Sequence, residues 1–349
     1  MNRRAFILAA AAVPAALGGC VHSPHMSPRW QTLPALPDAL GVAGAFAGVS
    51  GGQLLVAGGA NFPRGLPWEG GTKIWHDTVY QLDLPQGRWR AAGRLPRPLG
   101  YGVSITTPQG LICIGGSDAT RHFPGVFRLF TDTTGVRVEP LPSLPTPLAN
   151  AAGVLVRETI LVSGGSAEPG ERTASNHLIA LDLKRPAAGW QTLAPLPAAP
   201  RFLAVAAADG GDFFLFGGVA LVQRDGKTVR DYLHDAWCYR TGSGWERLPN
   251  LPRPLAAAAS PAPTMGDEFL LLPGDDGSLA GFQPPARHPG FPRRMLAYNR
   301  RTQTWRDAGK APFAHLTTPC VPWRGRHIIP SGEVRPGVRS PAVWALTFS

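Results

Sequence analysis

One short segment near the end of the chain places a carboxylate close to two guanidinium groups. It runs from 331 to 339 and contains Glu333, Arg335 and Arg339. A carboxylate that accepts a proton acts as a general base, and a guanidinium fork binds an anionic group through paired hydrogen bonds. The segment therefore indicates acid–base chemistry on an anionic substrate, with Glu333 as the base and the two arginines as ligands of the negative charge.

The same spacing allows a second arrangement of these three side chains. An arginine that pairs with Glu333 would weaken it as a base. A Glu333–Arg339 ion pair could also serve only to brace the fold, because structural ion-pair networks often imitate functional sites. The spacing does not decide between these arrangements.

A second segment, at 58–77, carries polar and aromatic side chains that a simple turn does not need. Lys73 is a candidate ligand for an anion, against the alternative of a solvated lysine. Asn61 is a candidate hydrogen-bonding ligand, against the alternative of an asparagine that caps a turn. Trp68 and Trp75 are candidate stacking platforms, against the alternative of packing over strand edges.

Both segments belong to a repeating framework. An apolar run that ends in two glycines recurs along the chain, followed each time by a second strand-like run and usually by a tryptophan. Successive copies lie 49 to 58 residues apart. They end at Gly58-Gly59, Gly115-Gly116, Gly164-Gly165 and Gly217-Gly218, with degenerate copies at Pro273-Gly274 and Ser331-Gly332. A period near ~50 residues is typical of kelch repeats, each of which is one four-stranded blade of a β-propeller. The sequence therefore predicts an all-β, six-bladed kelch-type β-propeller.

The ends of the chain predict how this ring closes. The tryptophan-containing half of the repeat occurs once before the first double glycine, at Trp30. It is missing after the last copy of the glycine pair, Ser331-Gly332, which is followed only by a strand-like run at 343–348. We predict that the strand at Trp30 completes the sixth blade, because closure removes exposed sheet edges. Residues 29–349 then form the propeller. Arg201 begins an innermost strand next to the channel, which makes it a further candidate ligand for a negative charge.

Residues 1–20 are typical of an export leader, and 21–28 of a short linker. Arg3 and Arg4 precede an apolar run at 5–17, which is shorter than the about 20 residues that a membrane-spanning helix needs. The sequence Leu-Gly-Gly-Cys that ends at Cys20 resembles a bacterial lipobox, with Cys20 as the lipidated residue. We therefore expect an exported protein of the periplasm or outer membrane, attached to the membrane only through a lipid on Cys20. The alternative is a plain secretory signal with a coincidental cysteine, and the choice between Sec and twin-arginine export stays open.

Composition narrows the choice of partners. The formal net charge is +11, but the arginines are scattered, so no nucleic-acid-binding stripe is indicated. A positive field would still attract an anionic substrate. The other cysteines, Cys113, Cys238 and Cys320, lie in different repeats without C-x-x-C spacing and are expected to be buried thiols. We expect no metal and no cofactor, and the sequence leaves the oligomeric state open.

In its two informative segments the chain resembles the sialic acid (N-acetylneuraminate) mutarotase or epimerase family of six-bladed kelch proteins, in its cyclically permuted mutarotase group. The resemblance rests on Gly-Glu-x-Arg-Pro-Gly-x-Arg at 332–339 and Gly-Gly-Ala-Asn-Phe-Pro at 58–63. Further matches are Lys73-x-x-x-Asp77 and the Gly-Val-Ser that follows Tyr101. The fifth repeat departs from the family pattern, with Pro273-Gly274 in place of a double glycine and a Pro-rich loop at 278–292.

This resemblance implies an enzyme that interconverts the α- and β-anomers of free sialic acid or a related acidic sugar, with Glu333 as proton acceptor. Such an enzyme opens the pyranose ring and closes it on the other face. A base takes the anomeric hydroxyl proton while an acid, or water, protonates the ring oxygen. In this interpretation the sugar carboxylate binds Arg339 and Arg201, and the further candidate ligands are Arg335, Asn61 and Lys73.

The main alternative is a non-catalytic kelch propeller that binds a glycan or a protein at the cell surface. A copper-dependent kelch oxidase is disfavoured, because it needs Tyr, His and Cys close together and the chain has only 5 tyrosines. A sialidase is disfavoured because the chain lacks Ser-x-Asp-x-Gly-x-x-Trp repeats at its blade turns.

Overall fold

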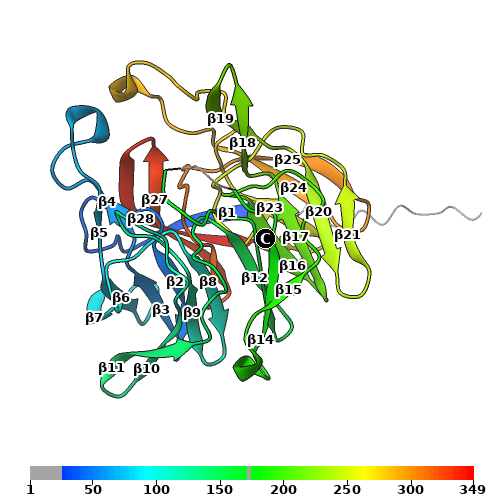
Figure 1. Cartoon of the computed structure of the whole chain (residues 1–349). Coiled ribbons are helices and arrows are strands. Elements are labelled where there is room, and N and C mark those ends of the chain that lie inside the picture. The colour runs from blue at the N-terminus through cyan, green and yellow to red at the C-terminus, as the bar shows by residue number, and fades with distance from the viewer. Residues whose placement is uncertain (1–25, 171–173) are drawn as a thin grey trace, which may run out of the picture.

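The computed structural model describes residues 26–170 and 174–349. In these residues the chain forms a ring of six four-stranded antiparallel sheets (Figure 1). This architecture confirms the predicted all-β, six-bladed propeller. The expected leader and Cys20 lie outside the described residues.

The first three blades follow one another along the chain. Blade 1 consists of β2 (Phe46–Ser50), β3 (Gln53–Ala57), β6 (Thr78–Leu82) and β7 (Arg90–Arg94). Blade 2 consists of β8 (Val103–Thr107), β9 (Gly110–Ile114), β10 (Val126–Asp132) and β11 (Gly135–Leu141). Blade 3 consists of β12 (Ala152–Val156), β13 (Thr159–Ser163), β14 (Leu178–Asp182) and β15 (Gln191–Leu193).

The second half of the ring repeats this order until the last blade. Blade 4 consists of β16 (Val205–Asp209), β17 (Asp212–Phe216), β20 (Ala236–Arg240) and β21 (Gly244–Leu248). Blade 5 consists of β22 (Thr264–Met265), β23 (Glu268–Leu271), β24 (Arg294–Asn299) and β25 (Thr304–Lys310). Blade 6 consists of β26 (Val321–Trp323), β27 (Arg326–Arg335), β28 (Val338–Phe348) and β1 (Pro28–Leu33).

Short elements in the loops complete the structure. Two small hairpins are formed by β4 (Ala60–Asn61) with β5 (Ile74–Trp75) and by β18 (Val219–Arg224) with β19 (Lys227–Tyr232). Three 3₁₀ turns are η1 (Pro67–Glu69), η2 (Pro186–Ala188) and η3 (Pro285–Arg287). Within the described residues, none of the helical turns is long and apolar enough to cross a membrane.

The ring closes through the two ends of the chain. Strand β1 pairs antiparallel with β28, and Trp30 stands opposite Leu346. The N-terminal strand therefore completes the sixth blade, as predicted. This pairing joins the first and the last described strands in one sheet, so that unfolding of either end opens the ring.

The double glycines lie where consecutive blades touch. A Cβ on Gly58 would lie 2.2 Å from the carbonyl oxygen of Leu99, just before blade 2, and Gly59 donates its N–H to that oxygen over 2.9 Å. Gly115 has the same relation to Leu148, just before blade 3. Glycine is required here because both the close approach and the positive φ of about 65° exclude a side chain.

The recurring tryptophans also join neighbouring blades. Trp89 donates its indole N–H to the carbonyl oxygen of Pro34 over 2.7 Å, and Trp190 does the same to Pro142 over 2.8 Å. The equivalent bonds of Trp245 and Trp305 reach Ala194 and Pro249. Each tryptophan thus fixes its blade to the Leu-Pro turn of the blade before it.

A closed ring of backbone hydrogen bonds surrounds the channel. One residue just before the first strand of each blade donates its N–H to the carbonyl oxygen of its counterpart in the preceding blade, over 2.7–2.8 Å. All six adopt a left-handed conformation, with φ between 53° and 69°. They are Gly44, Tyr101, Asn150, Leu203, Ala257 and Thr317. Side chains disfavour this conformation, so the ring of mutual bonds stabilises an arrangement that the isolated residues would avoid.

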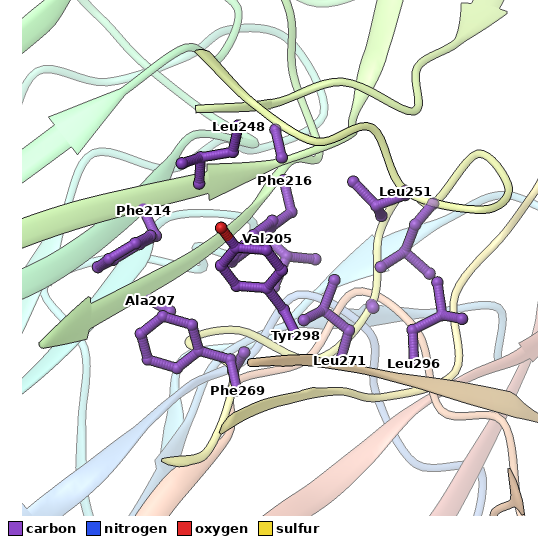
Figure 2. Packing of buried hydrophobic residues seen from close by; sticks show 14 of the residues in the cluster. Val205, Ala207, Phe214, Phe216, Leu248, Leu251, Phe269, Leu271, Leu296 and Tyr298 are labelled. Atoms are coloured by element: carbon purple, nitrogen blue, oxygen red, sulfur yellow. The ribbon is translucent and has the colours of Figure 1, made fainter. Parts of the chain in front are cut away.

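The hydrophobic core lies between adjacent blades. Between blades 4 and 5, Phe214 meets Phe269 edge-to-face at 4.9 Å, and Phe216 lies 5.8 Å from Tyr298 (Figure 2). These rings are all at most 6% exposed. The three described cysteines are free and buried, as predicted. Burial raises the pKa of Cys320 to about 12, which makes it an unreactive thiol.

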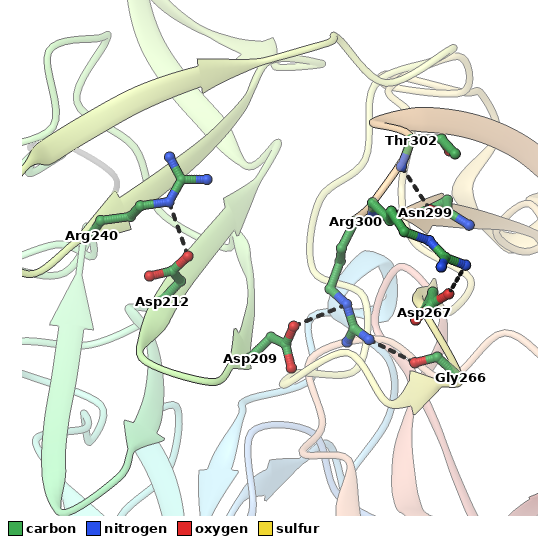
Figure 3. Close-up of polar contacts among 9 residues, drawn as sticks. Asp209, Asp212, Arg240, Gly266, Asp267, Asn299, Arg300 and Thr302 are labelled. Carbon is green, nitrogen blue, oxygen red and sulfur yellow. Dashed lines mark hydrogen bonds and ion pairs between the residues drawn. The ribbon is translucent and has the colours of Figure 1, made fainter.

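Polar side chains join the same two blades at the turns. Arg300, in the turn between β24 and β25, pairs with Asp209 at the end of β16 over 3.2 Å (Figure 3). Its guanidinium also donates to the carbonyl oxygen of Gly266 over 2.6 Å. Blades 4 and 5 are therefore held by apolar packing along the strands and by this ion pair at their ends.

Candidate active site

Loops from all six blades enclose a cavity of about 770 Å³ at one mouth of the channel. Its floor includes the backbone ring, because Tyr101, Asn150, Leu203, Ala257 and Thr317 line both this cavity and a narrower space of about 80 Å³ beneath it. A rigid ring that carries variable loops is a common way to build a binding site.

Glu333 lies in this cavity, near the end of β27. Strands β27 and β28 form a hairpin in which Glu333 stands directly opposite Arg339. The Glu333 carboxylate is held through one oxygen: Oε1 accepts the N–H of Gly337 over 2.7 Å and an N–H of Arg339 over 3.2 Å. Among the described residues Oε2 has no hydrogen-bond partner, and the side chain is 20% exposed. The carboxylate is thus fixed in direction while one oxygen stays available to take a proton.

Arg339 is a partner of Glu333 in this geometry. Its side chain is only 4% exposed, and its guanidinium lies 4.9 Å from the ring centroid of Phe62. Of the two arrangements that the spacing allows, the structure therefore has the paired one. Arg339 also lines the cavity, so it contributes positive charge there while it orients the base.

Lys73 brings a second positive charge to the same wall. Its ammonium lies 5.8, 5.3 and 5.2 Å from the ring centroids of Phe62, Trp75 and Tyr101, within the range of cation–π attraction. In the described part of the chain no carboxylate pairs with it. Phe62 lies near both Lys73 and Arg339, so a second cation shares this part of the cavity with the arginine that pairs with Glu333. A half-buried ammonium without an acidic partner suits an anionic ligand.

Arg201 corrects one sequence prediction, because it lies outside the described lining of the cavity. It is fully buried, and its two terminal nitrogens bind both carboxylate oxygens of Asp235 over 2.7 and 2.8 Å. A third bond reaches the carbonyl oxygen of Gly217 over 3.0 Å. The guanidinium has no face left for a substrate, because Asp235 and the Gly217 carbonyl group use its terminal nitrogens.

Asn61 is a second correction. It is 1% exposed and lies behind the described cavity wall. Its amide nitrogen donates to Asp38 over 3.1 Å and to the carbonyl oxygen of Gly41 over 2.9 Å, while its oxygen bonds to His76 over 2.9 Å. Because every polar atom of the side chain already has a protein partner, the structure assigns Asn61 to holding the loop that carries Lys73.

Arg335 is a third correction, since it points away from the described lining as well. It donates to the carbonyl oxygen of Ala286 over 3.0 Å and lies 6.0 Å from the ring centroid of Trp68. The blade 1 loop with Trp68, the blade 5 loop with Ala286 and the β27–β28 hairpin therefore meet at this guanidinium. Trp68 packs against this junction, while Trp75 lines the cavity.

The structure adds cavity residues that the sequence interpretation missed. Blades 2 and 3 contribute His122, Ser166 and Glu168, and blades 4 and 5 contribute Arg230, Tyr232, Asp275, Leu279, Phe282 and Phe291. The sequence did contain one signal for the residues that form the cavity floor. Tyr101, Asn150 and Thr317 each stand fourteen residues before the first position of the glycine pair, so the repeat itself marks this position.

Within the described residues no cluster of three or more potential metal ligands occurs.

Comparison with known proteins identifies similar chains. A family model described as N-acetylneuraminate epimerase matches residues 22–138 and 141–281, a span that includes Lys73 and ends before Glu333. The N-acetylneuraminate epimerase of Yersinia pestis (strain Pestoides F) is 48% identical over 103 residues, which cover 25% of this chain and 26% of that protein. The protein of the same name from Haemophilus influenzae (strain PittEE) is 26% identical over 235 residues, which cover 60% of each chain. The match thus spans less than two thirds of either relative.

A solved structure shares the fold of the whole chain. The structure of the protein YjhT superposes with a TM-score of 0.66 at 16% identity, over 91% of this chain and 99% of that one. At this identity the likeness concerns the propeller fold and not the activity.

Proposed function

Because this chain belongs to the N-acetylneuraminate epimerase family, we propose that it interconverts the α- and β-anomers of free N-acetylneuraminate or a closely related acidic sugar. One observation carries the proposal. Glu333 has one carboxylate oxygen held by two donors and the other without a partner among the described residues, in a cavity that also contains Lys73.

The reaction needs one proton removed and one supplied. Glu333 Oε2 takes the proton of the anomeric hydroxyl, the bond between the anomeric carbon and the ring oxygen breaks, and the ring oxygen takes a proton from water in the cavity. The open-chain keto form then rotates about the bond next to its carbonyl carbon. Closure on the other face returns the proton from Glu333 to the new anomeric oxygen, and the ring hydroxyl gives its proton back to water. Atoms and charge balance without a cofactor.

Lys73 is the proposed ligand of the sugar carboxylate in place of Arg201. In N-acetylneuraminate the carboxylate is bonded to the anomeric carbon itself, so the carboxylate ligand and the base must lie on the same wall. Lys73 and Arg339 both lie near the ring of Phe62, and Arg339 bonds to Glu333, which supports a shared site for the three groups. A carboxylate held at Lys73 brings the anomeric hydroxyl toward Glu333.

The test follows anomers directly by one-dimensional proton NMR. Freshly released α-N-acetylneuraminate is mixed with the wild-type protein, with Glu333→Gln or with no protein. We expect the β-anomer to form faster with the wild type alone, because the amide cannot accept the proton. Equal rates in all three samples would rule out the proposed activity and leave a binding propeller or a different sugar.

We also propose that the protein is exported and anchored by a lipid on Cys20. The support is the leader pattern of residues 1–20 and the Leu-Gly-Gly-Cys sequence that ends it. The proposal is tested by metabolic labelling with palmitate in a bacterial host. Wild-type protein should be labelled and membrane-bound, whereas Cys20→Ser should be neither. Wild-type protein that carries no label would contradict the lipid anchor.

A further inference from the structure

His122 has a defined tautomer at the cavity wall. It lies in the loop between β9 and β10 and is 8% exposed. Its Nδ1 lies 2.9 Å from the backbone carbonyl oxygen of Ser166, which belongs to blade 3. A carbonyl oxygen only accepts hydrogen bonds, so Nδ1 carries the proton and the neutral ring leaves Nε2 as an acceptor.

The surroundings keep this imidazole neutral. Burial lowers the pKa of His122, while the bond to Ser166 and the charges of Glu168 and Asp118 oppose that shift without cancelling it. Asp118 does not bind the ring, because it accepts bonds from Thr120 and from the N–H of residue 121. In the described structure Nε2 has no hydrogen-bond partner, and it is not among the polar atoms closed off from solvent. A lone-pair acceptor is therefore presented to the cavity.

The cavity wall divides into four chemical sectors, one of which comes from blade 4 and the start of the blade 5 loop and is polar, with Arg230, Tyr232 and Asp275. Blades 6 and 1 supply the charged sector of Glu333 and Lys73. The loop of blade 5 supplies an apolar sector with Leu279 and Phe282. Blades 2 and 3 supply a sector of acceptors, with the imidazole of His122 and the carboxylate of Glu168. A ligand held at the charged sector must direct its other substituents toward the remaining three.

The proposed substrate carries substituents that suit these sectors. Beyond the carboxylate and the anomeric centre it bears an N-acetyl group, which ends in a methyl, and a three-carbon polyol tail, which bears three hydroxyl donors. Buried acceptors need donors, and an apolar wall favours the methyl group. We propose that His122 is a specificity-determining residue that accepts a hydrogen bond from the polyol tail, so that the site selects acidic sugars with an intact tail.

This inference rests on the proposed mutarotation, and its test separates the two. The substrates are N-acetylneuraminate and its analogue with a shortened tail, which is made by periodate cleavage and borohydride reduction of a glycoside, where the anomeric carbon is protected, and is then released by hydrolysis. Anomer exchange at equilibrium is measured by proton exchange NMR for the wild type, His122→Ala, His122→Gln and His234→Ala. His234 is the control, because it is an exposed histidine outside the described cavity lining.

One neutral hydrogen bond changes kcat/KM by about tenfold. We expect the wild type and His234→Ala to prefer the full-length sugar by about that factor, and His122→Ala to treat both sugars alike. His122→Gln, which keeps an acceptor, should retain part of the preference. Thermal unfolding of each variant shows whether it is folded.

Two outcomes would overturn the inference. A wild type without tail preference would do so, as would a folded His122→Ala that keeps the preference, including one that loses activity by the same factor on both sugars. A wild type that accelerates exchange of neither sugar refutes the proposed function itself, and the inference falls with it.

Discussion

Gly337 donates its backbone N–H to Oε1 of Glu333 over 2.7 Å, so the turn at the tip of the β27–β28 hairpin fixes the position of this carboxylate. Gly337 has a φ of 80°, and a Cβ at this position would lie 2.8 Å from the ring of Pro67. The backbone that orients the proposed base is therefore packed against the blade 1 loop. Anything that loosens the hairpin should disturb Glu333 before it disturbs the propeller.

Arg335 gives the first prediction, because it fastens this hairpin to the blade 5 loop through Ala286. Arg335→Ala should lower kcat about tenfold with little change in KM, since a misplaced base slows chemistry more than binding. Arg335→Lys should restore part of the loss. The control is Arg287→Ala, which removes an exposed guanidinium from the same loop. An unchanged kcat in Arg335→Ala would show that the hairpin keeps its geometry without this bond.

Lys73 gives the second prediction. A charged hydrogen bond to a carboxylate contributes about 1.5–3 kcal/mol, so Lys73→Met should raise KM about tenfold to a hundredfold and leave kcat nearly unchanged. Lys73→Arg should recover part of the affinity. Lys227→Met serves as the control for net charge, because Lys227 is exposed on β19 outside the described lining. An equal rise of KM in both variants would point to a general field effect instead of a carboxylate ligand.

Arg201 gives the third prediction, which concerns stability. Arg201→Met leaves the carboxylate of Asp235, 17% exposed, without its main partner, and breaking such a buried pair costs about 3–5 kcal/mol. The kcat and KM of the folded protein should not change. Arg185→Met removes one side of an exposed pair with Asp182 and should cost far less, because water screens exposed ion pairs. Urea unfolding measures both costs, and a raised KM in folded Arg201→Met would revive its role as a substrate ligand.

The framework of the molecule follows from its sequence because the repeat is periodic. The glycine pairs and the tryptophans each make the same contact in successive blades, so one signal recurs often enough to be recognised. The position of Trp30 predicted the closure of the ring for the same reason. Glu333, Arg339 and Lys73 line one cavity because the β27–β28 hairpin and the blade 1 loop lie at the same mouth.

The errors at Arg201 and Arg335 and the omission of His122 have a common physical origin. The sequence shows that Arg201 begins an inner strand, but it does not show in which direction the side chain points. That direction is set by the ion pair with Asp235. Glu333 and Arg335 would share a face in a regular strand, but the pairing register shifts between them. His122 lies in an irregular loop, where no period predicts a neighbour such as Ser166. Side-chain direction in loops and at bulges thus depends on tertiary contacts that local patterns do not contain.

His315 gives the last prediction, on the pH dependence of stability. It is 3% exposed, and burial lowers its pKa to about 4 against the opposing effect of a bond to the Ser331 backbone. The unfolded chain takes up a proton near pH 6.5, whereas the folded chain does so only near pH 4. The stabilisation is therefore complete above about pH 6.5 and is lost as the pH falls toward 4, by about 3 kcal/mol.

Urea unfolding at several pH values for the wild type and His315→Gln checks this window. In His315→Gln the free energy of unfolding should fall by about 3 kcal/mol less than in the wild type between about pH 6.5 and 4. Asp235 acts in a lower window: burial raises its pKa, but its bonds to Arg201 and Trp237 outweigh this and hold it below the usual value. Its contribution is present above about pH 4 and is lost only in stronger acid, so it should remain in His315→Gln. An identical slope between pH 6.5 and 4 in both proteins would show that His315 does not remain neutral when buried.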